Sequence, residues 1–449
     1  MSVERLIQLD PEIVIVSEWN PEEPDFYQKL MAHPELGHLS AVRNRRVYSI
    51  SEKHLSTVSH YIVDGIEQMT RIIHPEVVRF GGDEQRGGAL PMRPLSLALP
   101  LRRGFPSFWP KAGLLTLLFF LLAGSVVVAT AVGSVAVPLP VVARLILNQL
   151  PLIHLAGWDA SQEIIILTVR LPRVLLAALI GGGLAVSGAA MQGLFRNPMA
   201  DPGVIGLSGG AALGAVIALG SGLAFHHHLI LPAFAFAGAF GTVLLVYRIA
   251  TRDGRTPVTT FLLSGMAVGI FMVSMMSLIL SRLTSVAVVG EILFWLMGGL
   301  DARGWIHLKV AFVPILLGSA GLLFFARDLN LLALEGEEGA AALGMRVKSV
   351  QRILLLLSSL VTGASVAFTG TIAFVGLIIP HVVRLIIGPD HRILLPASFL
   401  AGGIFLVGAD LLARTVISPE ELRLGTITSL VGVPFFLYLL HKGIRDGGR

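Results

Sequence analysis

Three consecutive histidines, His226, His227 and His228, form the densest group of possible metal ligands in the chain. A zinc site needs several ligands that converge on one ion, and three adjacent side chains of a regular element cannot all face the same point. We therefore expect no metal site here. The chain also lacks cysteine, which excludes disulfides, thiolate metal sites and a cysteine nucleophile.

The sequence also lacks a motif for binding nucleotides. The sequence contains no Gly-x-x-x-x-Gly-Lys-Ser/Thr run, the loop whose backbone N–H groups cradle nucleotide phosphates. We therefore predict that the chain is not an ATPase and that it binds no cofactor of its own.

A few polar side chains interrupt long apolar segments near their ends, namely Gln192, His381, Arg384 and Asp410. Charged groups inside a bilayer are costly, so such residues are candidates for function. His381 directly follows Pro380, and a packing histidine beside a proline break is the simpler interpretation than a proton or metal site.

The elements that position these residues are apolar. Hydrophobic residues make up 54% of the 449 residues and charged residues only 14%, which is typical of a polytopic membrane protein. Ten segments approach the ~20 residues that a helix needs to cross a bilayer. They lie near 112–132, 172–191, 203–220, 229–249, 259–281, 306–326, 351–369, 371–387, 394–413 and 427–441. The predicted fold class is therefore an all-α polytopic membrane protein with about ten transmembrane helices.

A polar elbow, Gln192 to Pro202, joins two of these helices, and its Asn197, Pro198, Asp201 and Pro202 end one helix and begin the next. The helix before the elbow is rich in Gly, Ala and Ser. Small residues allow close contact with other helices, so this helix is predicted to be buried.

The motifs around the elbow, RLPR (170–173) and GAAMQGLFRNPMADPGVIGLSGGAALG (188–214), resemble the permease family of binding-protein-dependent ABC importers for iron-siderophores, haem and cobalamin. The resemblance continues, in order, over roughly residues 111 to 442. Further motifs are FLLSGMAVG (261–269), FWLMGG (294–299), GEEGAAALG (336–344), FVGLIIPHVVRLIIG (374–388), ADLLART (409–415) and GVPFFLYLL (432–440).

The resemblance implies two contact regions. Arg170, Arg173 and Arg414 match positions that receive acidic residues of a docked binding protein, although interfacial snorkelling or pairing of Arg414 with Asp410 remains an alternative. The loop 327–352 matches the segment that sits in a groove of the ATPase, and we expect two short helices in it, the first with Glu337 and Glu338 near its start. The matching residues are Gly336, Glu337, Glu338, Ala341, Leu343 and Gly344. A helix lying on the membrane surface is the alternative.

The resemblance also places the fifth helix along the cargo path. Its candidate pathway or gate residues are Gly265, Met266, Gly269, Met272, Ser274 and Met275. Core packing explains the same small and flexible residues equally well.

Residues 1–77 differ from the rest and are predicted to form a small α/β soluble fragment, with strands at 13–16 and 46–50 and helices at 3–9 and 58–73. They resemble the last part of the C-terminal lobe of the cognate binding proteins. A tethered docking module and a fusion remnant both remain open. Residues 78–110 are predicted to be a linker, and residues 111–449 the permease domain.

Basic residues are more numerous in the loops on the side that carries both ends of the permease domain, which predicts that both ends are cytoplasmic. The expected location is the inner membrane of a bacterial or archaeal cell, with multiple passes. The net charge of +5 follows from these loops and not from a nucleic-acid surface.

The sequence thus predicts the permease subunit of an ATP-driven importer of an iron-siderophore, with haem or cobalamin as alternative cargo. The implied partners are a second permease copy, two copies of an ATPase that uses ATP and magnesium, a periplasmic or lipid-anchored binding protein, and membrane lipid. A rival class is a secondary transporter driven by an ion gradient. It would need ionisable residues near the bilayer midplane, which the sequence does not show. A self-contained receptor-permease would need a complete two-lobed ligand site.

Overall fold

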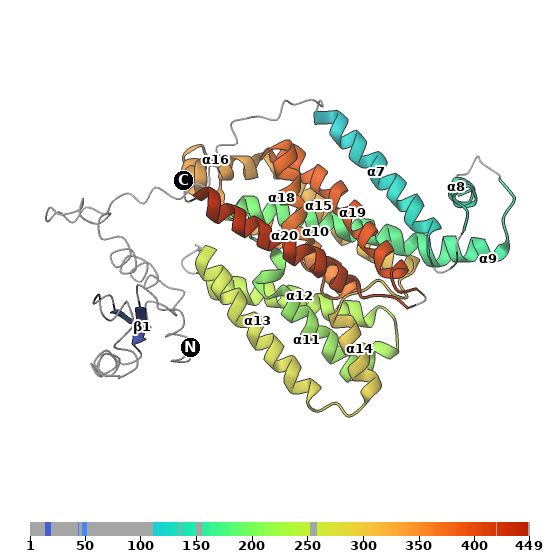
Figure 1. Ribbon diagram of the computed structural model, residues 1–449, viewed down its shortest axis with the longest axis horizontal. Helices are drawn as coiled ribbons and strands as arrows, with labels where there is room; N and C mark the ends of the chain where they lie inside the picture. The colour runs from blue at the N-terminus through green and yellow to red at the C-terminus, as the bar shows by residue number, and fades with distance from the viewer. Residues whose placement is uncertain are drawn as a thin grey trace. The chain divides into compact units, whose positions relative to one another are not determined.

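The computed structural model describes residues 14–18, 44, 47–51, 111–133, 135, 137–149, 155–251, 258–418 and 420–447. The chain divides into two compact units, Met1–Ser96 and Leu97–Arg449. All regular elements described in the second unit are helices, so the predicted all-α membrane architecture is confirmed (Figure 1).

In the first unit, β1 (Val14–Glu18) and β2 (Val47–Ser51) pair as parallel strands, with Val14 opposite Val47. Both predicted strands are therefore confirmed. A parallel pair needs a long crossover connection, and the interval between the two strands provides one. The helices predicted at 3–9 and 58–73 and the linker predicted at 78–110 lie outside the described residues.

The second unit contains a helix at each of the ten predicted apolar segments. They are α7 (Lys111–Ala131), α10 (Leu171–Leu194), α11 (Leu207–Gly220), α12 (Ile230–Ala250), α13 (Val258–Leu280), α15 (Trp305–Phe324), α17 (Val347–Thr369), α18 (Val375–Ile387), α19 (His391–Thr415) and α20 (Leu424–Gly447). Within the described residues, seven helices are long and apolar enough to cross a membrane, and α11, α14 (Val286–Leu296), α18 and the apolar part of α20 are shorter.

Several helices were not predicted. They are α8 (Leu139–Leu147), α9 (Ala160–Glu163), the π-helical η1 (Ile164–Arg170), the 3₁₀ turns η2 (Pro202–Ile205) and η3 (Leu223–Phe225), and α14. Because α9, η1 and α10 are continuous from Ala160 to Leu194, the predicted start at residue 172 was wrong. Pro172 lies directly after the π-helical turn inside this continuous helix, where its missing N–H removes one backbone hydrogen bond.

The loop predicted to hold two short helices contains α16 (Ala326–Ala342), which is broken at Gly336. The φ of 73° and ψ of −173° at Gly336 belong to a region that essentially only glycine adopts. Two short helices are thus confirmed, but Glu337 and Glu338 begin the second one, not the first.

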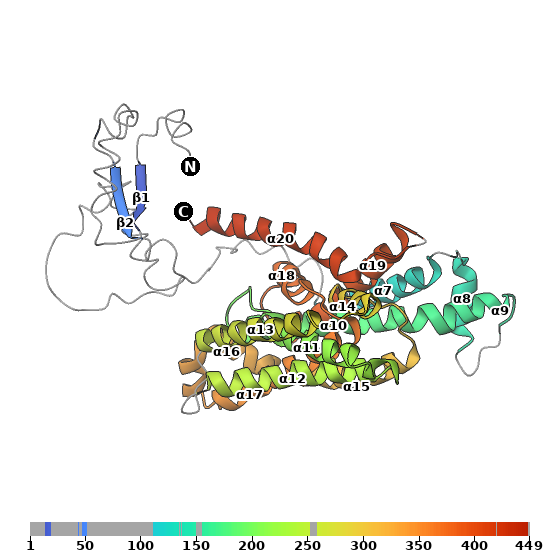
Figure 2. The ribbon, with the colours of Figure 1, turned by 90° about the horizontal axis from the view of Figure 1, so that it is seen from below.

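Helix α10 lies in the middle of the helical unit in both ribbon views, and nearly all of its residues are buried (Figure 2). Its closest partner is α19, because Gly181 and Gly402 each face the other's carbonyl oxygen and leave no room for a side chain. Gly210 of α11 and Gly238 of α12 meet in the same reciprocal way. Small residues thus bring whole helix backbones into contact, as predicted for the helix before the elbow.

Candidate functional sites at the two ends of the helical unit

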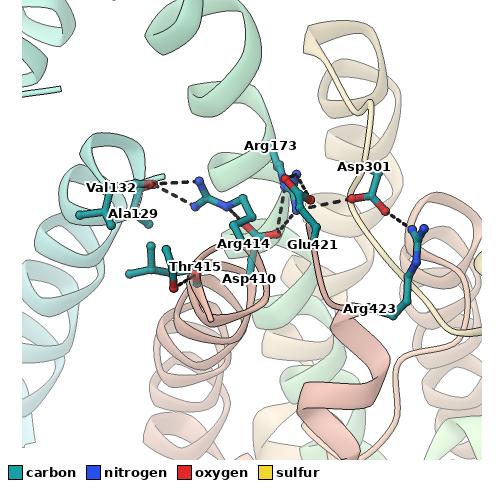
Figure 3. Close-up of polar contacts among 10 residues, drawn as sticks. Ala129, Val132, Arg173, Asp301, Asp410, Arg414, Thr415, Glu421 and Arg423 are labelled. Atoms are coloured by element: carbon teal, nitrogen blue, oxygen red, sulfur yellow. Dashed lines mark hydrogen bonds and ion pairs between the residues drawn. The ribbon is translucent and has the colours of Figure 1, made fainter. Parts of the chain in front are cut away.

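A buried ion cluster lies where α10 begins and α19 ends (Figure 3). The Asp410 side chain is completely buried and accepts hydrogen bonds from Arg173 Nε at 3.0 Å and from Arg414 Nε at 2.9 Å. Arg414 also donates to the carbonyl oxygens of Ala129 and Val132 at the end of α7. One carboxylate therefore joins three helices, and the pairing of Arg414 with Asp410 that the sequence left open is present.

The cluster extends into the loops beside it. Arg173 Nη1 donates to Glu421 Oε2 at 2.9 Å, and Arg173 Nη2 lies 3.8 Å from Asp301 Oδ1. Asp301 also pairs with Arg423. Burial raises the pKa of Glu421 above its usual range, and the neighbouring Asp301 raises it further, whereas Arg173 lowers it. The two loop carboxylates are the accessible charges here, since the side chains of Asp301 and Glu421 are 42% and 36% exposed.

Arg170 is not part of this ion cluster. Its guanidinium donates to the carbonyl oxygens of Thr130, Ala131 and Val135, and only 6% of the residue is exposed. Unpaired carbonyl groups at the C-terminal end of a helix need donors, and the last turn of α7 has no basic residue of its own. All three arginines expected to dock a partner thus have bonds within the chain, and a docking role stays a prediction.

The opposite end of α10 carries the elbow. Buried Gln192 donates to the carbonyl oxygens of Gly376 and Leu377 and accepts a 3.0 Å hydrogen bond from Arg384 Nη1. Asn197 Oδ1 accepts from the N–H of Met199, and Asp201 Oδ1 accepts from the N–H of Gly203.

These bonds give the elbow residues structural roles that match the predicted motif. Burial raises the pKa of Asp201, and the hydrogen bond from Gly203 partly offsets this effect. Pro198 and Pro202 flank this turn, and Pro202 opens η2. Pro380 and half-buried His381 lie inside α18.

The predicted coupling residues all lie on α16 or directly after it. Glu337, Glu338, Ala341, Leu343 and Gly344 are exposed, whereas Gly336 is buried at the break. The exposed fraction is 78% for Leu334 and 67% for Leu343. Large exposed leucines beside acidic residues, on a helix that does not qualify as a membrane span, are typical of a surface that binds another protein.

The pathway candidates divide into two groups. Gly265 and Gly269 of α13 face Gly206, where a side chain would meet the Gly265 carbonyl oxygen at 2.6 Å, so these glycines allow close helix packing. Met266 and Ser274 are exposed, and Met272 and Met275 are half-buried. None of the six is among the residues that line the cavity described next.

A cavity of about 890 Å³ lies beside the elbow. Its walls come from η2, the start of α11, the end of α14, residues 371–374, α18 and α20. Among its polar wall residues are Asp201, Thr371, Thr426 and Ser429. The sequence analysis missed all of these except Asp201. The hydroxyl groups of Thr426 and Ser429, in the apolar first part of α20, were the signal that could have indicated this helix.

The consecutive histidines pack against neighbouring rings. His227 and His228 stack at 4.1 Å between ring centroids, and His228 meets His307 edge-on at 5.5 Å. Among the described residues, no group of three or more His, Cys, Asp or Glu side chains is arranged to hold a metal ion.

The chain is similar to known transport proteins over most of its length. The profile of a family described as the FecCD transport family matches residues 117–442, and a profile described as periplasmic binding protein matches residues 1–53. A solved chain described as an inward-facing conformation of a metal-chelate type ABC transporter superposes with a TM-score of 0.64 at 32% identity. That match covers 74% of this chain and all of the other.

Curated relatives carry different cargo names. The cobalamin import system permease protein BtuC of Halobacterium salinarum is 48% identical over 64% of this chain and 75% of its own length. The hemin transport system permease protein HmuU of Yersinia pestis is 42% identical over 62% of this chain and 83% of its own length. The Fe(3+)-citrate import system permease protein YfmD of Bacillus subtilis is 41% identical over 65% of this chain and 85% of its own length.

Proposed function

Because the chain belongs to the FecCD transport family of ABC importer permeases, and is itself no ATPase, we propose that it forms the pore of an importer for metal chelates. Two permease copies would enclose the path, and two copies of a separate ATPase would bind beneath them and use ATP and magnesium. A periplasmic or lipid-anchored binding protein would deliver the cargo. Alternate closing of the two ends would then move it inward.

The observation that carries this proposal is the exposed surface of α16, formed by Leu334, Glu337, Glu338, Ala341, Leu343 and Gly344. It lies on the connection between the spanning helices α15 and α17, which shows neither an apolar span nor a flexible Gly/Ser composition. An ATPase groove that buries these leucines would gain hydrophobic contact and acidic partners for its basic residues.

We propose that the cargo is a ferric siderophore, one of the cargoes carried by the family that the sequence motifs resemble. The 48% identity to a cobalamin permease favours cobalamin as the second candidate, and haem is the third. A cavity of about 890 Å³ with mostly apolar walls suits a large organic ligand that shields its metal.

We propose further that both ends of the permease domain face the cytoplasm of a bacterial or archaeal cell, on the basis of the basic loops. The ion cluster of Arg173, Asp410 and Arg414 then lies at the outer end, where a binding protein arrives. An acidic residue of that protein would compete for Arg173 with Glu421 and Asp301, so docking would involve an exchange of ion pairs.

The test is co-purification of the ATPase. The substitutions Glu337→Ala, Leu343→Ala and Gly344→Ala together should abolish recovery of the ATPase with the tagged permease. Leu317→Ala, at a leucine that is 65% exposed on the spanning helix α15, is the matched control and should leave recovery unchanged. Uptake of ferrioxamine or cyanocobalamin by vesicles that contain the chain and an ion gradient, but no ATPase, would instead support the secondary-transporter class.

A further inference from the structure

The side chain of Asn330, on the first half of α16, bonds to the start of α19. Asn330 Nδ2 donates to Asp390 Oδ1 at 2.8 Å, and Asn330 Oδ1 accepts from the backbone N–H of His391 at 2.8 Å. The Nδ1 atom of the His391 ring lies 2.8 Å from the same oxygen. Because a backbone N–H can only donate, the amide oxygen must face His391, and the amide orientation is fixed.

These bonds supply acceptors for backbone N–H groups at the start of α19. The first N–H groups of a helix have no carbonyl partner within the helix. In α19 the N–H of Arg392 bonds to the Asp390 side chain, and the N–H of His391 bonds to Asn330. A residue of α16 therefore completes the N-terminal cap of a different helix, and moving α16 away would expose that cap.

His391 extends the junction to a third helix. The residue is 2% exposed, and its ring packs directly on Gly193 of α10, where any side chain would overlap the Nε2 atom. The Asn330, Asp390 and His391 side chains and Gly193 thus connect helices α16, α19 and α10. Since α10 and α19 also touch backbone to backbone at Gly181 and Gly402, they form one closely packed pair.

The second half of α16 has a weaker attachment. Beyond the break at Gly336, Gln351 of α17 donates to Glu337 Oε1 at 2.8 Å, and this bond is exposed. Exposed polar bonds contribute little to stability. Of these two polar connections between α16 and the spanning helices, the Asn330 junction is therefore the stronger one.

We propose that Asn330 is a positioning residue that transmits movement of the ATPase-bound α16 to the α10–α19 pair through Asp390 and His391. This rests on the proposed function, because it presumes that α16 binds an ATPase. Loss of these bonds should leave the rate of ATP hydrolysis nearly unchanged and should lower the amount of cargo transported per ATP.

The experiment compares variants of the assembled permease–ATPase complex in vesicles, with the binding protein and cyanocobalamin or ferrioxamine as cargo probe. Asn330→Ala should keep ATPase activity within about twofold and lower cargo moved per ATP about tenfold, the scale expected when a partly buried hydrogen bond that holds one of two states is lost. Gln351→Ala, which removes the exposed attachment, should change that ratio less than twofold.

A rescue variant separates positioning from general damage. Asn330→Asp alone places two carboxylates together and should uncouple the complex. Combined with Asp390→Asn, it restores an amide–carboxylate pair, keeps a good N-cap residue and still offers an acceptor to His391, so coupling should return.

The outcomes distinguish the two proposals. If the wild-type complex moves neither cargo probe with ATP, the proposed function fails. If the wild type transports and Asn330→Ala keeps the same ratio of cargo to ATP, or the double variant stays as uncoupled as Asn330→Asp, the positioning role of Asn330 is refuted alone.

Discussion

Asp410 holds two guanidinium groups while its own carboxylate is completely buried. Removing one partner of a buried ion pair leaves the other charges without compensation, which costs about 3–5 kcal/mol. We predict that Asp410→Asn lowers the free energy of unfolding by about that amount, because Arg173 and Arg414 stay buried. Thermal unfolding of the detergent-solubilised protein measures this.

The control for this prediction is Asp301→Asn. The Asp301 side chain is 42% exposed, and its pair with Arg423 is near the surface, so the change should cost less than about 1 kcal/mol. Equal destabilisation by both substitutions would show that the buried position of Asp410 is not what matters.

Glu421 provides a pH test at the same cluster. Its pKa is raised mainly by burial and then by Asp301, so the folded state holds this proton more tightly than the unfolded state does. The resulting stabilisation is present at pH values below the usual glutamate range and is lost as the pH rises through the raised pKa.

We therefore predict that the melting temperature of the wild type, relative to Glu421→Gln, falls as the pH rises from 4 to 7. The variant carries a permanently neutral side chain and lacks this titration. A difference that stays constant over the range, or grows in favour of the wild type, would contradict the raised pKa.

Among individual residues, the sequence predicted several polar positions but not all of their contacts. The motifs located Gln192, Asp201 and Asp410 because a polar group in an apolar helix is conspicuous. The partners of Arg170 and the backbone partners of Arg414 could not be found in this way, because the carbonyl groups that these arginines bond lie about 40 and 280 residues away in the chain. Contacts between residues so far apart in the chain leave no local pattern in the sequence.

At the level of helices, the contact between α10 and α19 can be tested by comparing two glycines of α19, Gly402 and Gly408. A side chain at Gly402 would meet the backbone of Gly181 and the Ala185 side chain, whereas one at Gly408 would meet no atom within 4 Å. We predict that Gly402→Ala destabilises the folded permease by about 1–3 kcal/mol, as overpacking does. Gly408→Ala should be neutral or should stabilise by up to about 1 kcal/mol through helix propensity.

Thermal unfolding of the two variants in the same detergent measures the difference. If Gly408→Ala proved the more destabilising of the two, the result would contradict the close packing of α10 against α19 at Gly402.

The helices found from sequence were those whose length matches a bilayer, because hydrocarbon imposes that length on any apolar span. Helix α14, with 11 residues, is too short for that criterion and was missed. The extension of α10 back to Ala160 was missed because Arg170 and Arg173 suggested a corner, whereas their side chains bond to other helices.

For the whole molecule, the first unit is the open question. Its two strands agree with the predicted part of a binding-protein lobe, and the matching profile covers residues 1–53. The ion cluster, the exposed surface of α16 and the cavity are all formed by residues of the second unit, so we predict that deletion of residues 1–77 leaves transport unchanged. Uptake at matched membrane levels measures this, and lost uptake with normal levels would indicate a docking module.

The cargo was beyond sequence reasoning for a physical reason. The cavity walls come from four separate stretches of chain, within residues 201–208, 296–297, 371–377 and 425–434, and each stretch alone is a mostly apolar segment with few polar groups. Selectivity would also depend on the binding protein that we propose as a partner.

The reciprocal glycine contacts have a consequence for evolution. Where two side chains collide, enlarging one can be compensated by shrinking the other. At Gly181 and Gly402 the obstacle to each is the other's carbonyl oxygen, which every amino acid carries, and the same holds for Gly210 and Gly238. No second-site substitution within such a pair can restore the fit, so we expect descendants of this chain to keep both members or to lose the helix contact.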